Sequence, residues 1–173
     1  MSKENQFYSL GAMLLLLALT HSLAAQTEDL PIPAPAKTIA TEDRTVLEAI
    51  TKPKDRTKKA IELAESRLKR AAELTEKQDF TAVLEQLGRY QGLVAHTMAF
   101  LKPFAAQRLR EPFRNMEVAL RAQVPRIEGL RRLTPLAYAV HVRAIGEYAR
   151  AARAEALNAF FDDTVIPEKD GKP

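Results

Sequence analysis

The stretch Asp79–Leu101, DFTAVLEQLGRYQGLVAHTMAFL, decides the fold. Its mostly apolar positions recur at alternating spacings of three and four, which keeps one side of an α-helix against a neighbouring helix. These positions are Phe80, Val83, Leu87, Tyr90, Val94, Thr97 and Leu101. The carboxylate of Asp79 is expected to cap the helix, and Pro103 is expected to lie just past its end. At ~1.5 Å per residue this helix would be about 33 Å long, and the rest of the chain is predicted to cover it.

Three further segments carry the same helical spacing. An amphipathic helix is predicted over 55–77, and the short link at Gln78-Asp79 should join it to the central helix as an antiparallel hairpin over 55–101. Two more helices are predicted over 108–133 and 135–161. Because no segment shows strand alternation, the sequence predicts an all-α fold, an antiparallel four-helix bundle.

Prolines and hydroxyl side chains mark the expected helix ends. A short helix is predicted to begin with Thr41 as its cap and to end or kink at Pro53. Pro125 lies inside the third long helix and should kink or split it. Thr134 is expected to cap the last helix, with Pro135 at the first helical position.

The beginning of the chain has the pattern of an export signal. Residues 1–25 combine Lys3, an apolar run over Leu10–Leu19 and small residues before a cleavage position, as in a secretory signal peptide. The competing interpretation is an uncleaved membrane anchor, because residues 5–27 contain no Lys, Arg, Asp or Glu. Both interpretations place the rest of the chain outside the cytoplasm.

The export signal is followed by a segment rich in proline. Alternating prolines in residues 26–40 favour an extended linker. The helical bundle domain is then expected over 41–162, and a polar, flexible tail over 163–173.

Charge is unevenly distributed along the 173 residues, which carry a formal net charge of +4. Residues 26–101 hold 12 basic and 12 acidic side chains, whereas residues 102–153 hold 11 Lys and Arg against 4 Glu. An anionic partner is therefore expected to meet the second half of the chain. The absence of cysteine excludes disulfides, thiolate zinc sites and a covalently attached c-type haem.

Two sets of residues are candidates for binding. The basic residues of the third helix are almost all arginine, whose guanidinium groups match carboxylates and phosphates: Arg108, Arg110, Arg114, Arg121, Arg126, Arg131 and Arg132. The alternative is that these arginines pair with Glu on neighbouring helices. Gly88 and Gly92 lie four apart inside the central helix, away from its apolar seam. They indicate either close approach of another backbone or partner, or tolerated exposed glycines.

The sequence offers few groups for metal binding or catalysis. His96 and His141 are the histidines outside the predicted signal, and neither follows Glu at the Glu-x-x-His spacing of bundle metal sites. Catalytic triads, nucleotide-binding glycine loops and H-E-x-x-H motifs are absent from the sequence. We therefore expect no enzyme activity, no cofactor and no metal, and the alternative is a metal- or haem-carrying bundle that uses His96 and His141.

The stretch Arg56–Tyr90 resembles an uncharacterised family of exported bacterial helical-hairpin domains. Arg70 stands where that family usually has an acidic residue. The matching residues are Leu63, Ala64, Glu65, Arg67, Leu68, Ala71 and Leu74. The resemblance implies an extracytoplasmic helical hairpin, a domain of unknown function, with no known activity and no site residues to carry over.

These observations together predict a periplasmic or secreted helical protein that acts through contacts rather than catalysis. The expected partner is another envelope protein or an anionic envelope surface. Nucleic acid is not expected, because aromatic and basic residues are not interleaved. Contact with a membrane is expected only through an uncleaved signal or a peripheral surface.

Overall fold

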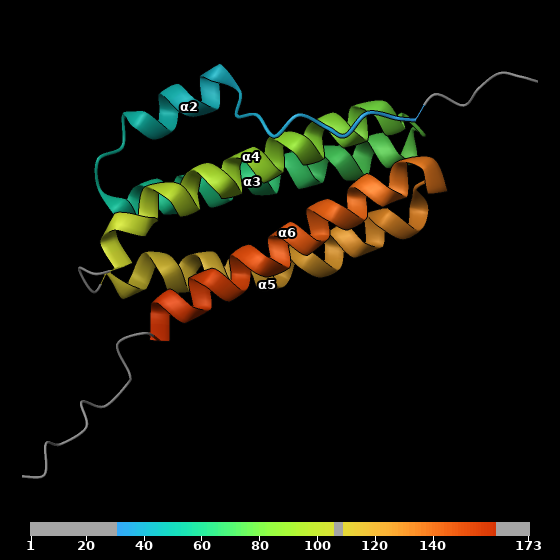
Figure 1. The fold of residues 1–173 in the computed structure, drawn as a ribbon. Coiled ribbons are helices and arrows are strands. Elements are labelled where there is room, and N and C mark those ends of the chain that lie inside the picture. Colours follow the sequence, from blue (N-terminus) through green and yellow to red (C-terminus); the bar gives the residue numbers. More distant parts are fainter. Residues whose placement is uncertain (1–30, 106–108, 162–173) are drawn as a thin grey trace, which may run out of the picture. The chain divides into compact units, whose positions relative to one another are not determined.

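The computed structural model describes residues 31–105 and 109–161, and each regular element in them is an α-helix (Figure 1). The helices are α2 (Thr41–Glu48), α3 (Pro53–Glu76), α4 (Phe80–Ala105), α5 (Arg110–Leu133) and α6 (Leu136–Phe161). The all-α fold class is therefore confirmed. The predicted signal peptide, the start of the linker, Arg108 and the tail lie outside the described residues. The chain divides after Pro31, and all described helices belong to the unit that begins at Ile32.

The long helices form a bundle of two hairpins. α3 packs against α4 and α5 packs against α6, while α3 also contacts α5 and α4 contacts α6. Figure 1 shows that consecutive long helices run in opposite directions. Each of them contributes fully buried side chains to one shared core, among them Leu68, Leu87, Leu120 and Ile145.

The central helix α4 is buried on more than its predicted seam. Six of the seven seam positions are buried, and Phe80 is half-buried against the Tyr138 ring. The opposite sides of α4 are covered as well, because Leu84, Gln91 and Met98 are also buried. A helix covered on several sides needs neighbours beyond a single partner helix.

A tight turn makes the α3–α4 hairpin, as the sequence predicts. Gln78 has a positive φ of 59°, and its N–H donates to the Thr75 carbonyl at 3.0 Å. The N–H of Asp79 donates to the Leu74 carbonyl at 3.1 Å, which completes the usual left-handed end of a helix. Asp79 then caps α4, since its Oδ1 accepts the N–H of Ala82 at 3.1 Å.

Prolines end fewer helices than predicted. α4 continues through Pro103 to Ala105, so the prediction that Pro103 lies past its end is wrong. A proline in a last turn removes one hydrogen bond but leaves the preceding turns intact. Pro53 is the first residue of α3 and does not end the preceding helix, which stops earlier at Glu48. Pro125 lies within α5, which continues from Arg110 to Leu133 without a split.

The two predicted hydroxyl caps are also wrong. The N-cap of α2 is Ala40, so Thr41 lies inside the helix, where its carbonyl accepts the Thr45 hydroxyl. The hydroxyl of Thr134 donates back to the Leu130 carbonyl at 2.7 Å, and α6 begins after Pro135. At Thr134 the hydroxyl thus bonds a backbone carbonyl four residues earlier, which competes with capping, whereas at α2 the helix begins one residue earlier than predicted.

Residues 32–39 form an extended segment that lies along α4 (Figure 1), and we call this segment the strap. Ile32 and Ile39 are half-buried against the core. This part of the predicted linker 26–40 is thus packed against the bundle instead of acting as a spacer. Its prolines keep it extended, and its isoleucines provide the apolar contacts.

Candidate functional site

Arginines gather on the outer side of the α5–α6 hairpin. Arg110, Arg114, Arg121 and Arg132 are separated by 4, 7 and 11 residues, so they return to one side of α5. On α6, Arg153 contacts Glu117 of α5, and Arg143 and Arg150 lie one heptad apart. We call the surface formed by these seven arginines the basic face: Arg110, Arg114, Arg121, Arg132, Arg143, Arg150 and Arg153.

Part of the predicted arginine set is neutralised by glutamate. Arg121 bonds both carboxylate oxygens of Glu117, and the Nε of Arg153 donates to Glu117 Oε1 at 3.0 Å. Glu117 is only 3% exposed, and the hydrogen bond from Arg121 lowers the pKa of its carboxyl. These contacts join α5 to α6 from within the basic face.

The other predicted arginines of α5 differ in their surroundings. Arg131 donates to Glu128 at 2.6 Å, and this bond lowers the pKa of the Glu128 carboxyl. Arg132 lies 4.0 Å from the same carboxylate. Arg126 lies away from the basic face and pairs with Glu65 of α3. Arg108 is outside the described residues.

Three arginines of the basic face form no ion pair with a described residue. Arg114, Arg143 and Arg150 are exposed, and no carboxylate of the described residues lies within ion-pair distance of them. Residues 109–161 hold nine Arg against five Glu, so pairing cannot neutralise this half of the bundle. The face is therefore suited to an anionic partner.

An exposed apolar tip lies at the end of the same hairpin. Leu133 is 69% exposed, Leu136 is 83% exposed and Val140 is 54% exposed, and Arg131 and Arg132 directly precede them in the chain. This tip was not predicted from the sequence. Leu133 could have indicated it, because Leu133 is a large apolar residue outside the buried stripe of its helix, which includes Ile127 and Leu130.

The glycine pair of α4 lies directly under the strap. A Cβ added to Gly88 would lie 2.5 Å from the carbonyl oxygen of Ala36, and one added to Gly92 would lie 2.6 Å from the carbonyl carbon of Thr38. Real side chains do not approach a backbone so closely, so any larger residue at either position would have to displace the strap. The strap therefore covers the Gly88 and Gly92 side of α4, which was predicted as a possible contact for a partner.

The two histidines have separate surroundings. Arg56 donates to Nε2 of His96 at 2.9 Å, and because a guanidinium only donates, this nitrogen has no lone pair left for a metal. Burial and the charge of Arg56 lower the pKa of His96. His141 Nε2 donates to the carbonyl of Ile32 in the strap at 2.7 Å. The described residues contain no group of three or more His, Asp or Glu that could hold a metal ion.

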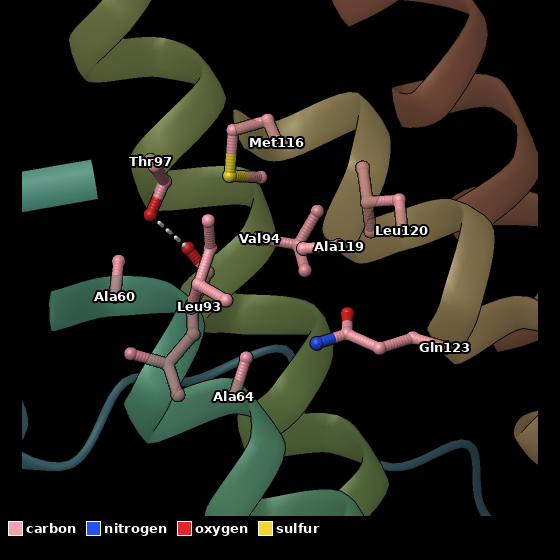
Figure 2. Close-up of a pocket in the computed structure, with 10 residues that line it drawn as sticks. Ala60, Ala64, Leu93, Val94, Thr97, Met116, Ala119, Leu120 and Gln123 are labelled. Atoms are coloured by element: carbon pink, nitrogen blue, oxygen red, sulfur yellow. Dashed lines mark hydrogen bonds between the residues drawn. The ribbon is translucent and has the colours of Figure 1, made fainter. Parts of the chain in front are cut away.

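Gln123 lines a small cavity in the core (Figure 2) and bonds buried Tyr90 and half-exposed Glu65. The Tyr90 hydroxyl donates to Gln123 Oε1 at 3.1 Å, and Gln123 Nε2 donates to Glu65 at 3.2 Å. Burial raises the pKa of Tyr90, so its hydroxyl stays a donor. The cavity measures about 10 Å³, enough for one water at most, and its wall includes Leu93, Met116 and Gln123. This part of the core therefore has no room for a ligand.

Comparison of the chain with known protein families, curated proteins and solved structures finds no match. The family resemblance over Arg56–Tyr90 thus stays a prediction. Within residues 31–105 and 109–161, no helix combines the length and apolar character needed to cross a membrane.

Proposed function

We propose that this chain is an exported, non-enzymatic four-helix-bundle protein that binds an anionic surface of the bacterial envelope through its basic face. The observation that supports the proposal is a set of three exposed arginines, Arg114, Arg143 and Arg150, that form no ion pair with any described residue, on the hairpin that ends in the apolar tip. The predicted signal peptide supports export to the compartment where such surfaces occur.

Anionic lipid headgroups and phosphate-bearing polymers are the chemistry that this face fits. Guanidinium groups bind phosphate oxygens through two parallel hydrogen bonds, and two glutamates of the α5 helix, Glu117 and Glu128, are already bonded by arginines. Exposed Leu133 and Leu136 can enter the headgroup region of a bilayer, where apolar area adds to electrostatic attraction.

The test is sedimentation of the processed protein with vesicles of phosphatidylglycerol and phosphatidylcholine. Replacing Arg114, Arg143 and Arg150 together with Gln should weaken binding several-fold at low salt, and the difference should shrink as salt is raised. These three are chosen because replacing Arg121 would instead leave buried Glu117 with one partner fewer.

The matched control replaces three exposed lysines of the other hairpin, Lys58, Lys69 and Lys77, with Gln. Both triple variants lose three positive charges, so net charge alone would weaken both equally. Equal loss in the two variants, or unchanged binding by the arginine variant, would refute the assignment to the basic face.

A further inference from the structure

A pocket of about 290 Å³ lies between the strap, α4 and α6, far larger than the cavity in the core. Its polar lining consists of Lys37 from the strap, Gln91 from α4, and His141 and Tyr148 from α6. Pro35 and Ile145 are part of its apolar wall. The volume lies near the lower end of the range for ligand pockets, about 300 Å³, and suits a small organic molecule.

Gln91 is the least expected residue in this lining. It is only 4% exposed, and its side-chain amide has no hydrogen bond to any other described residue. A side-chain amide can donate two hydrogen bonds and accept two. The nitrogen and oxygen of Gln91 are not among the enclosed polar atoms that lack a partner, so the amide can be reached from the pocket, where a bound molecule can form hydrogen bonds with it.

The charge of the pocket is positive. No carboxylate among the described residues forms an ion pair with Lys37, whose Nζ lies 5.9 Å from the centre of the Tyr148 ring. No acidic side chain lines the pocket. His141 uses Nε2–H to hold the Ile32 carbonyl, because a carbonyl oxygen only accepts. The strap thus forms one wall and also supplies the cation.

We propose that the pocket binds a small organic acid, with its carboxylate at Lys37 and Gln91 and its apolar part against Pro35 and Ile145. One ammonium and one amide match a single carboxylate, whereas a phosphate dianion would call for more cationic donors. This site lies apart from Arg114, Arg143 and Arg150, so it does not depend on the proposed surface binding.

The experiment titrates the whole processed protein with benzoate, butanoate, benzyl alcohol and inorganic phosphate, followed by calorimetry and by the NMR signals of Gln91 and His141. Saturable binding of benzoate or butanoate, with at least tenfold weaker binding of benzyl alcohol, is expected. Lys37→Met and Gln91→Leu should each weaken carboxylate binding about tenfold or more, while Lys69→Met, an exposed control on α3, should not.

Gln91→Leu also separates binding from folding. Since it replaces an amide that bonds no other described residue with an apolar side chain of similar size, its midpoint of urea unfolding should stay level or rise while binding is lost. Absence of saturable carboxylate binding, preference for phosphate, or unchanged binding by Lys37→Met and Gln91→Leu would overturn the proposal. Vesicle binding by Gln91→Leu should match the unmodified protein, which keeps this test independent of the basic face.

Discussion

Replacing Gly92 with Ala tests the contact between the strap and α4. The new methyl carbon would lie 2.6 Å from the Thr38 carbonyl carbon, whereas carbon atoms in favourable contact are about 3.5–4.0 Å apart. The strap must therefore move outward by about 1 Å. Because Gly92 lies in the interior of α4 and is packed into the core, α4 cannot easily shift instead.

Two effects of opposite sign determine the result. Alanine favours a helix over glycine by about 1 kcal/mol, which alone would stabilise the protein. Displacing the strap loses about 1 kcal/mol for each of half-buried Ile32 and Ile39, and about 1 kcal/mol for the hydrogen bond to His141. We therefore expect Gly92→Ala to lower the free energy of unfolding by up to about 2 kcal/mol.

Gly129→Ala is the matched control. Gly129 also lies inside a helix, but a Cβ added there meets no atom within 4 Å. This substitution should raise the free energy of unfolding by about 0.5–1 kcal/mol, measured by urea denaturation. In Gly92→Ala, the Thr38 amide, which donates to the Ala36 carbonyl, should also exchange its hydrogen faster. If Gly92→Ala stabilised the protein as much as Gly129→Ala, the strap contact would be refuted.

Two further predictions concern buried polar groups. Tyr90→Phe leaves Gln123 Oε1 without its donor and should lower the free energy of unfolding by about 1–3 kcal/mol in urea titrations; a change within ±0.3 kcal/mol would contradict the hydrogen bond. Because Arg121 and Arg153 lower the pKa of Glu117, its ion pairs should stabilise the fold above about pH 4.5 and cease to do so as pH falls through the lowered folded-state pKa. Thermal midpoints from pH 7 to pH 3 should fall less steeply in Glu117→Gln, and identical slopes would rule out this role.

The buried faces of the helices could be predicted from the sequence because burial imposes its own spacing. Ala64 and Leu68 of α3, and Val142, Ile145 and Ala149 of α6, are buried as the pattern predicts. Helix ends were less predictable. A cap or a proline changes the free energy of a helix end by only a small amount. The packing of a long helix can contribute more, as at Pro103 and Thr134.

The strap and its pocket could not be predicted from local patterns. Gly88 and Gly92 indicated a close approach, but the strap residues that cover them lie about fifty positions away, and no spacing links such segments. Alternating prolines favour an extended chain whether it is free or packed. Gln91 falls outside the apolar seam of α4, so its burial becomes evident only with the strap in place.

The strap also decides which side of the bundle can meet a partner. With α3, α6 and the strap around it, α4 has its glycine face closed and has buried residues from Val83 to Leu101. The α5–α6 hairpin has no such cover among the described residues, and it carries both the unpaired arginines and the apolar tip. A partner that reached α4 would first have to displace the strap and break the bond between His141 and Ile32. A partner that binds the basic face does not have to displace the strap, so no binding free energy is lost to that rearrangement.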